Sequence, residues 1–139
     1  MTREEFEQLI EQEFLNAIPE KFRPHIKNVA FLVENEPSPD VRRVEGLQQG
    51  ETLLGYYHGI PYPMRGDWYG MGTTMPDTIT LYQRPIEEEA ADMSRLNLDM
   101  THEAAVRQVV RETIWHEVAH HFGMDEHTVR HREDIRDSL

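Results

Sequence analysis

Two hydrophobic patterns of different period divide the first part of the chain. Behind a capping box formed by Thr2 and Glu5, apolar residues recur every three or four positions, which predicts a helix over about residues 3–18 that ends before Pro19. The next apolar run, residues 29–33, is short, rich in β-branched and aromatic residues, and bounded by polar ones. That composition predicts a buried strand.

The middle of the chain predicts the rest of a small sheet. Residues 53–58 form a second short apolar and aromatic run, and residues 78–82 alternate clearly, so each predicts a strand. Residues 61–76 between them are rich in Gly, Pro, Met and aromatic residues without periodicity, and a loop of this length is usually functional or mobile. Residues 34–50 predict a loop with room for one turn of helix, and Pro85 opens a short acidic helix.

A second helical pattern predicts a long helix near the end of the chain. It starts at a cap provided by Asp99 or Thr101 and stops at Gly123, and residues 125–138 predict a last, mostly solvated helix. The order of one helix, three strands and then helices predicts a single α+β domain over residues 1–139, with a small mixed sheet packed on the long helix. The positions that carry the long pattern are Ala105, Val106, Val109, Val110, Thr113, Ile114 and Ala119.

The end of this long helix carries the pattern H-E-x-x-H, from His116 to His120. Helical residues four apart are separated by about 40° around the axis and about 6 Å along it, so the two histidines share one face and can bind one metal ion. Glu117 lies about 100° round from His116, where its carboxylate can reach a water on that metal. Zinc needs neutral imidazole nitrogens and peptide hydrolysis needs a base, so the pattern predicts zinc-dependent peptide-bond hydrolysis.

The composition of the chain excludes several classes of protein. A length of 139 residues, with 38 % apolar and 29 % charged residues, suits one globular domain. The net charge of −12 argues against nucleic acid or an anionic membrane as a partner, because both select for basic patches. The chain has no cysteine, which excludes disulfides and thiolate ligands. With no secretory signal at its start and no apolar run as long as a membrane span, it is expected to be cytoplasmic.

Two other interpretations of the H-E-x-x-H pattern compete with a peptidase. Chance can place two surface histidines and a solvated glutamate on a helix. The position of the pattern late on a capped amphipathic helix, and Gly123 three residues after His120, favour a metal site instead. The second alternative is a non-catalytic metal-binding protein that recognises a peptide or protein partner. Glu117 counts against it, because a pure binder needs no base there.

Other polar and aromatic residues are expected to have structural roles. His121 lies about 100° off the metal face, which favours packing or solvent exposure over ligation. The helical spacing of Arg107, Arg111 and Trp115 predicts packing and ion pairs with nearby carboxylates. Strand tyrosines can supply a hydroxyl to an oxyanion but are more often structural, which applies to Tyr56, Tyr57 and Tyr69. The histidines without supporting spacing are His25, His58, His102 and His131.

Three segments together resemble the small bacterial zincin-like metallopeptidases, also called minimal zincins, a family long carried as a domain of unknown function. The resemblance extends from about residue 29 to residue 127. It implies a truncated zincin-like core with a small mixed sheet of three or four strands above the active-site helix. It also implies that His116 and His120 bind one Zn²⁺ ion and that Glu117 is the catalytic base. The three segments are residues 53–61, 79–85 and 116–123.

The third metal ligand has several candidates. The family pattern H-E-x-x-H-x-x-G-x-x-D implies a ligand ten residues after the first histidine. That position is Glu126, whose side chain is one methylene longer than the family's aspartate. Asp125 and His127 are also competent zinc ligands, and an acidic residue here can instead cap the last helix. The spacing favours Glu126.

The substrate cleft is expected to be shallow on one side. Only 16 residues, Met124 to Leu139, follow Gly123, whereas larger zincins build a second subdomain there. The methionine turn of metzincins is also missing, because no methionine occurs after Met124. Larger zincins bind an extended substrate along an exposed sheet edge, for which residues 53–58 are the candidate. Peptide or protein substrates are then short or loosely held, or a second copy of the chain completes the wall. Such an open site also predicts slow turnover.

Overall fold

The computed structural model describes residues 1–26, 28–59 and 77–121. Within these ranges the α-helices are α1 (Arg3–Glu13), α2 (Pro39–Val44), α3 (Gln83–Leu96) and α4 (His102–His121). The strands are β1 (Val29–Glu34), β2 (Gly55–His58) and β3 (Asp77–Tyr82), and a 3₁₀ helix, η1, spans Glu20–His25. The expected order of elements is confirmed for this part of the chain. The loop predicted at residues 61–76, the stop at Gly123 and the helix predicted at residues 125–138 lie outside the described residues.

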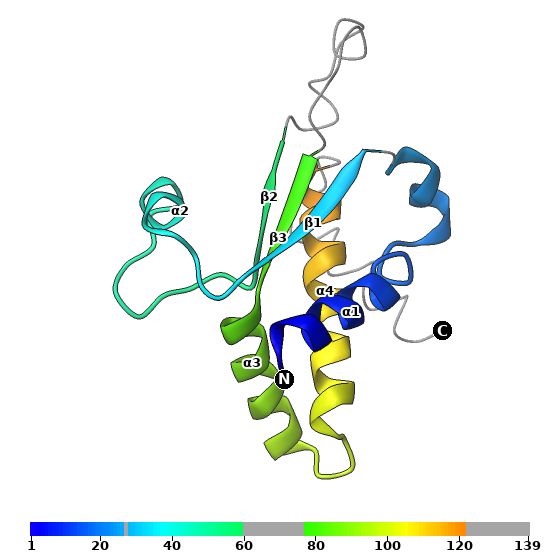
Figure 1. Ribbon diagram of the computed structural model, residues 1–139, viewed down its shortest axis with the longest axis vertical. Coiled ribbons are helices and arrows are strands. Elements are labelled where there is room, and N and C mark those ends of the chain that lie inside the picture. The colour runs from blue at the N-terminus through cyan, green and yellow to red at the C-terminus, as the bar shows by residue number, and fades with distance from the viewer. Residues whose placement is uncertain (27, 60–76, 122–139) are drawn as a thin grey trace, which may run out of the picture.

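The three strands form one mixed sheet in the order β1-β3-β2 (Figure 1). β1 runs parallel to β3, with Val33 opposite Leu81, and β2 runs antiparallel to β3, with Tyr57 opposite Ile79. β3 is therefore the central strand, and all of its residues except Thr78 are buried. This confirms the small mixed sheet expected of an α+β fold with a truncated zincin-like core.

The prediction of a buried strand at residues 29–33 is only half right. The strand forms, as β1, but it lies at an edge of the described sheet, and Leu32 is 50 % exposed whereas Val33 is buried. Successive side chains of a strand point to opposite faces. Val33 shares the face of Leu81, which packs in the core, and Leu32 points to the other face. A continuous apolar run therefore did not mean that both faces were covered.

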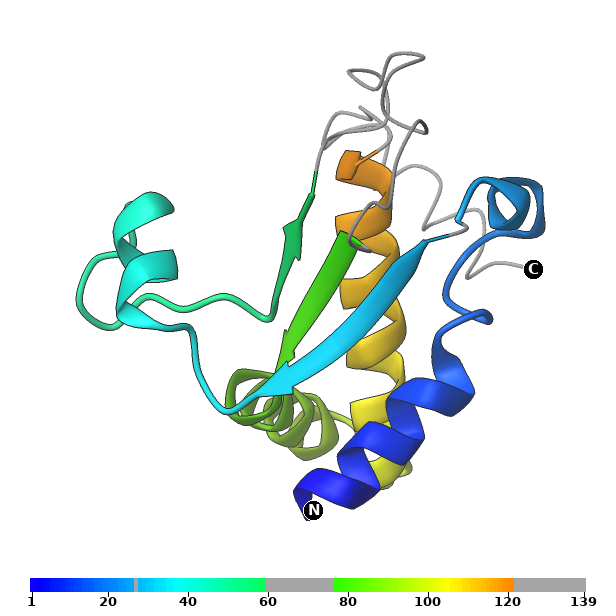
Figure 2. The ribbon, with the colours of Figure 1, turned by 45° about the horizontal axis from the view of Figure 1, so that its top comes forward.

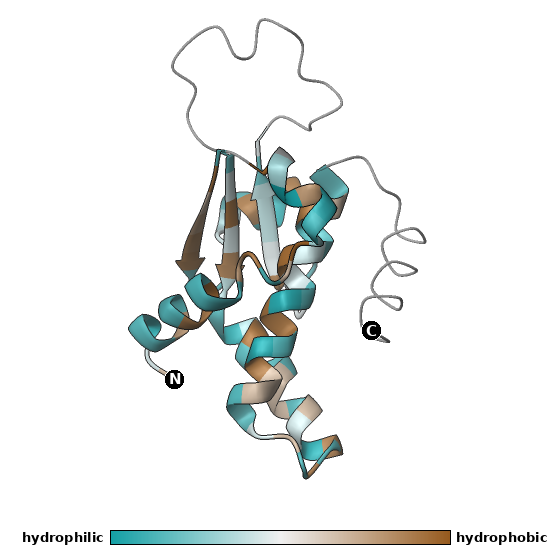
Figure 3. Ribbon diagram, turned by 90° about the vertical axis from the view of Figure 1, so that its right-hand side faces the viewer, coloured by the Kyte–Doolittle hydropathy of each residue, from teal (hydrophilic) through white to brown (hydrophobic). Residues whose placement is uncertain are grey.

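The core lies between one face of the sheet and the helices α1 and α4 (Figures 1 and 2). α3 packs along α4 next to the end of β3. Hydrophobic segments run along the strands and the helices and are separated by hydrophilic ones, as the alternation of colours in Figure 3 shows. At the α1–α4 contact, the buried carboxylate of Glu13 pairs with Arg107 at 3.0 Å and with Arg111 at 3.5 Å. The arginines therefore form the ion pairs expected of them.

Two helix boundaries differ from the prediction. α1 ends at Glu13 rather than near residue 18, because the chain turns there to bury Ala17 and Ile18 in the core. α3 begins at Gln83, two residues before Pro85, and continues for 14 residues, so it is not short. Pro85 sits in the first turn of α3, where the missing N–H costs no hydrogen bond. None of the helices in the three described ranges combines the length and apolar character needed to cross a membrane.

The start of α4 resolves the choice between two caps. The hydroxyl of Thr101 accepts a hydrogen bond from the backbone N–H of Ala104 at 3.1 Å, so Thr101 rather than Asp99 caps the helix. From this cap α4 runs without interruption to His121, and its buried side includes Val106, Val110 and Ile114. The helix therefore carries the whole H-E-x-x-H pattern in its last two turns.

Gly55 allows β2 to lie close against α4. A Cβ at this position would lie 2.7 Å from Cγ2 of Thr113 and 3.3 Å from the carbonyl oxygen of Thr80. Real Cβ atoms do not approach other atoms as closely as the first of these distances. The absence of a side chain at Gly55 therefore sets the spacing between the strand and the helix that carries the candidate site.

Gly55→Ala is expected to lower the free energy of unfolding by about 1–3 kcal/mol, because the new methyl group overpacks the contact with Thr113. Thr113→Ser removes Cγ2 but keeps the hydroxyl, which donates to the carbonyl oxygen of Val109 at 2.7 Å. In a Thr113→Ser background, Gly55→Ala should lower the free energy of unfolding by a smaller amount. Urea denaturation of the four proteins measures this coupling, and an equal cost of Gly55→Ala in both backgrounds would contradict it.

Candidate metal centre

The last two turns of α4 bring the two histidines of the pattern together. The Nε2 atoms of His116 and His120 lie 3.1 Å apart, and the ring centroids are separated by 4.6 Å with an interplanar angle of 53°. His120 is exposed and His116 is half-buried. Both rings therefore direct the same nitrogen to one point at the surface of the helix, as the spacing predicted.

This histidine pair fits a zinc ion. Zinc binds imidazole nitrogen at about 2.0–2.1 Å with tetrahedral geometry, which places two nitrogen ligands about 3.3 Å apart. The observed separation of 3.1 Å is close to that value. Among the described residues, no group of three or more His, Cys, Asp or Glu side chains is arranged to hold a metal. The expected third ligand, Glu126, and its alternatives Asp125 and His127 lie outside the described residues.

Glu117 lies between α4 and the edge of the sheet. Its carboxylate accepts a hydrogen bond from the backbone N–H of Tyr57 in β2. Burial raises the pKa of Glu117 from its ordinary value of 4.5 to about 7, and the negative charge of Glu45 adds to the rise, whereas the Tyr57 amide opposes it. A carboxylate in this environment binds a proton more strongly than one in water.

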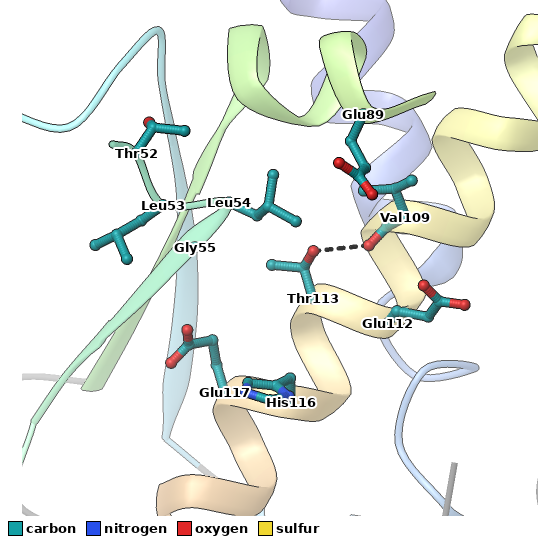
Figure 4. Close-up of a pocket in the computed structure, with 10 residues that line it drawn as sticks. All are labelled: Thr52, Leu53, Leu54, Gly55, Glu89, Val109, Glu112, Thr113, His116 and Glu117. Atoms are coloured by element: carbon teal, nitrogen blue, oxygen red, sulfur yellow. Dashed lines mark hydrogen bonds between the residues drawn. The ribbon is translucent and has the colours of Figure 1, made fainter. Parts of the chain in front are cut away.

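Two cavities meet at Glu117. The larger, of about 440 Å³, lies between the residues that lead into β2 and the helices α3 and α4 (Figure 4). The smaller, of about 350 Å³, lies between β2 and the last turn of α4 and is also lined by Glu45. Figure 4 shows the Glu117 carboxylate pointing toward the strand, with His116 beside it. The residues that line the larger cavity are Thr52, Leu53, Leu54, Gly55, Glu89, Val109, Glu112, Thr113, His116 and Glu117.

Two of the remaining candidate residues pack in the interior, and His102 lies at the other end of α4. His121 is buried and stacks on the Tyr57 ring, with 4.3 Å between centroids, so it packs as predicted. His102 lies at the start of α4, near Glu87, and His58 is exposed at the end of β2. Trp115 is fully buried against Phe22. The side chain of His25, together with Tyr69 and His131, lies outside the described residues.

Sequence reasoning missed three residues near the site, namely Glu45, Tyr57 as a backbone donor, and Asp77. Glu45 comes from the end of α2, which the pattern of the chain does not place near α4. Asp77 did carry a signal, because it occupies the strand face of Ile79 and Leu81, both fully buried. An acidic residue at the head of a buried apolar stripe indicates a specific partner. One such partner is the Tyr57 hydroxyl, which donates to Asp77 Oδ2 at 2.9 Å.

In the metal-free protein, Glu117→Gln is expected to be more stable than the wild type at pH 8, by about 1–3 kcal/mol. The folded wild type keeps its Glu117 proton up to a pKa of about 7, whereas the unfolded chain releases it near 4.5. The free energy of unfolding therefore falls as pH rises between these values, and the glutamine variant lacks this loss. Denaturation in chelator between pH 5 and 8 measures the difference. Glu103→Gln, at an exposed position of the same helix, is the control. A difference in free energy of unfolding between Glu117→Gln and the wild type that does not change with pH would contradict the prediction.

Comparison with known protein families gives a match over most of the chain. The family described as zincin-like metallopeptidase matches residues 26–135. This range includes the described strands β1, β2 and β3, the helices α3 and α4, and the histidine pair. No curated protein is significantly similar to the chain.

Proposed function

The chain belongs to the zincin-like metallopeptidase family, and from that premise we propose that it hydrolyses peptide bonds with Glu117 as the general base and one zinc ion held by His116, His120 and Glu126. The family indicates peptidase chemistry and zinc binding in general terms. The observation that supports the roles of His116, His120 and Glu117 is the 3.1 Å approach of the two Nε2 atoms, next to the Glu117 carboxylate at the sheet edge. Glu126 is proposed from the spacing of the family pattern alone.

The protein side chains supply the proton transfers. A zinc ion held by the histidines would polarise the scissile carbonyl group and make a water molecule more acidic. Glu117 accepts a proton on its carboxylate from the attacking water and delivers it to the leaving amine nitrogen. The N–H of Tyr57 orients that carboxylate before the substrate reacts, which lowers the entropic cost of the proton transfer.

The edge of β2 is the surface on which we place the substrate. β2 pairs only with β3 in the described sheet, and the amide of Tyr57 faces Glu117 rather than β3. An extended peptide can add to such an edge through backbone hydrogen bonds to the groups of β2 that Glu117 does not occupy. This arrangement supports a peptide or protein substrate, and we propose that the scissile bond lies beside Glu117.

The larger cavity predicts a preference for substrates with a lysine or arginine side chain. Its walls combine aliphatic side chains, which suit a long methylene stem, with carboxylates, which suit a cationic head group. No lysine or arginine is among its described lining residues. Charge reversal of two lining carboxylates, Glu89→Lys with Glu112→Lys, should reduce cleavage of lysine peptides relative to leucine peptides by about tenfold or more. An unchanged ratio would contradict the preference. The aliphatic walls are Leu53, Leu54 and Val109.

Digestion of a peptide library tests the proposed function. The zinc-loaded protein should produce new amino termini at defined positions. The chelated protein should produce none, and restoring zinc should restore the same cleavage sites. A zinc-loaded protein that binds library peptides but generates no new termini would instead support the non-catalytic alternative.

A further inference from the structure

A buried polar cluster lies beside the last turn of α4. It consists of Asp77 at the start of β3, Tyr57 of β2 and His121 at the end of the described part of α4. Asp77 is 4 % exposed, and its Oδ2 accepts the Tyr57 hydroxyl hydrogen bond at 2.9 Å. His121 Nε2 lies 3.6 Å from the same oxygen. Three elements that are distant in sequence therefore meet at one carboxylate.

The cluster constrains the geometry of these elements more strongly than apolar packing would. A buried carboxylate costs free energy unless hydrogen bonds compensate, and an apolar side chain at position 77 would simply extend the stripe of Ile79 and Leu81. Hydrogen bonds are directional and fix rotamers as well as distances. The backbone of Gly59 lies against Asp77, since a Cβ at position 59 would be 2.4 Å from Cγ of Asp77. The absence of a side chain at Gly59 therefore lets the residue after β2 lie against the start of β3.

Tyr57 connects this cluster with the candidate active site. Its hydroxyl binds Asp77, its ring stacks on His121 with an interplanar angle of 16°, and its backbone N–H binds Glu117. Glu117 and His121 are four residues apart, so they lie on the same side of α4 and both face β2. His120 belongs to the turn between them. A rotation of that turn would change the 3.1 Å separation of His120 from His116.

We propose that Asp77 is a positioning residue, which acts through Tyr57 and His121 to hold the last turn of α4 in the orientation that lets His116 and His120 share one ion. The same contacts keep Glu117 at the edge of β2. This inference rests on the proposed function, since it assumes that the histidine pair binds zinc. Residues that hydrogen-bond directly to metal ligands typically change metal affinity by 10- to 100-fold when they are removed. Asp77 acts one contact further away, so we expect an effect at the lower end of that range.

Tyr57→Phe tests the proposal with the loss of a single oxygen atom, because the ring stacking and the backbone N–H remain. Zinc affinity is measured by competition with a chromophoric chelator, and the absorption spectrum of the cobalt-substituted protein reports ligand geometry. We expect the dissociation constant for zinc to rise by about tenfold or more and the cobalt bands to shift. Asp77→Asn should change both readouts in the same direction, and it carries the test if Tyr57→Phe does not fold.

Two controls separate positioning from a general loss of stability. Tyr56→Phe removes a hydroxyl from the opposite face of the same strand, and Val33→Ala destabilises the core at the far edge of the sheet. Both should bind zinc with the wild-type dissociation constant and cobalt spectrum. If the wild type binds zinc and Tyr57→Phe matches it in both readouts, the positioning proposal alone is overturned. If the wild type binds no zinc, the proposed function is overturned as well.

Discussion

Glu117→Gln is expected to lower peptide hydrolysis by about 10²- to 10⁴-fold while zinc remains bound, because the amide cannot accept the proton of the attacking water. Glutamine has nearly the same shape, and its carbonyl oxygen can still accept the Tyr57 N–H that the carboxylate accepts. The substitution therefore removes the base and leaves the packing between α4 and β2 in place. The rate of cleavage of a single defined peptide, measured with zinc in excess, gives the effect.

The matched control for this experiment is Glu103→Gln, which makes the same chemical change in the first turn of α4, far from the histidine pair. It should retain the wild-type rate. Zinc content, measured on the same preparations, should be equal in all three proteins. A Glu117→Gln protein that keeps more than about a tenth of the wild-type rate would show that another group accepts the proton.

His116→Ala and His120→Ala are each expected to weaken zinc binding by more than about 100-fold, a larger effect than the loss of an orienting residue. Each substitution removes one of two imidazoles that direct Nε2 to a common point. Chelator competition on the purified variants measures the change. His102→Ala removes an exposed imidazole at the start of the same helix and should not alter zinc affinity. Wild-type affinity in His116→Ala would contradict the histidine pair as ligands.

The same titration identifies the third ligand. Glu126→Gln should weaken zinc binding more than Asp125→Asn or His127→Ala, because Glu126 has the spacing of the family pattern. A larger loss in either of the other two variants would move the third ligand to that residue. Because the three residues are adjacent in sequence, each variant serves as a control for a general effect of changing this segment.

The histidine pair could be located from the sequence because its geometry depends only on the helix. His116 and His120 are one turn apart in any α-helix, and the apolar positions of α4 together with the Thr101 cap predict that helix strongly. The strands could also be predicted from local sequence, since each is a short run rich in β-branched and aromatic residues. The burial of β1 could not be predicted in this way, because the exposure of Leu32 depends on which strand lies beside it and on which face of the sheet remains uncovered.

The surroundings of Glu117 could not be predicted, because they depend on long-range registry. The Tyr57 amide reaches Glu117 only because β2 pairs antiparallel with β3 and lies close to α4 at Gly55. Glu45 reaches the same carboxylate from the end of α2. Neither relation leaves a periodic trace in the sequence. The sequence therefore predicted the side chains to which we assign the chemistry, and the structure adds the contacts that orient them.

Anomalous X-ray scattering at the zinc absorption edge, recorded from crystals grown with zinc, tests the central claim most directly. The proposed function predicts one strong peak within bonding distance, about 2.0–2.1 Å, of the Nε2 atoms of both His116 and His120, with Glu126 as a third neighbour. Crystals soaked in excess zinc that show no peak there, or that show the two imidazole rings turned away from each other, would contradict it.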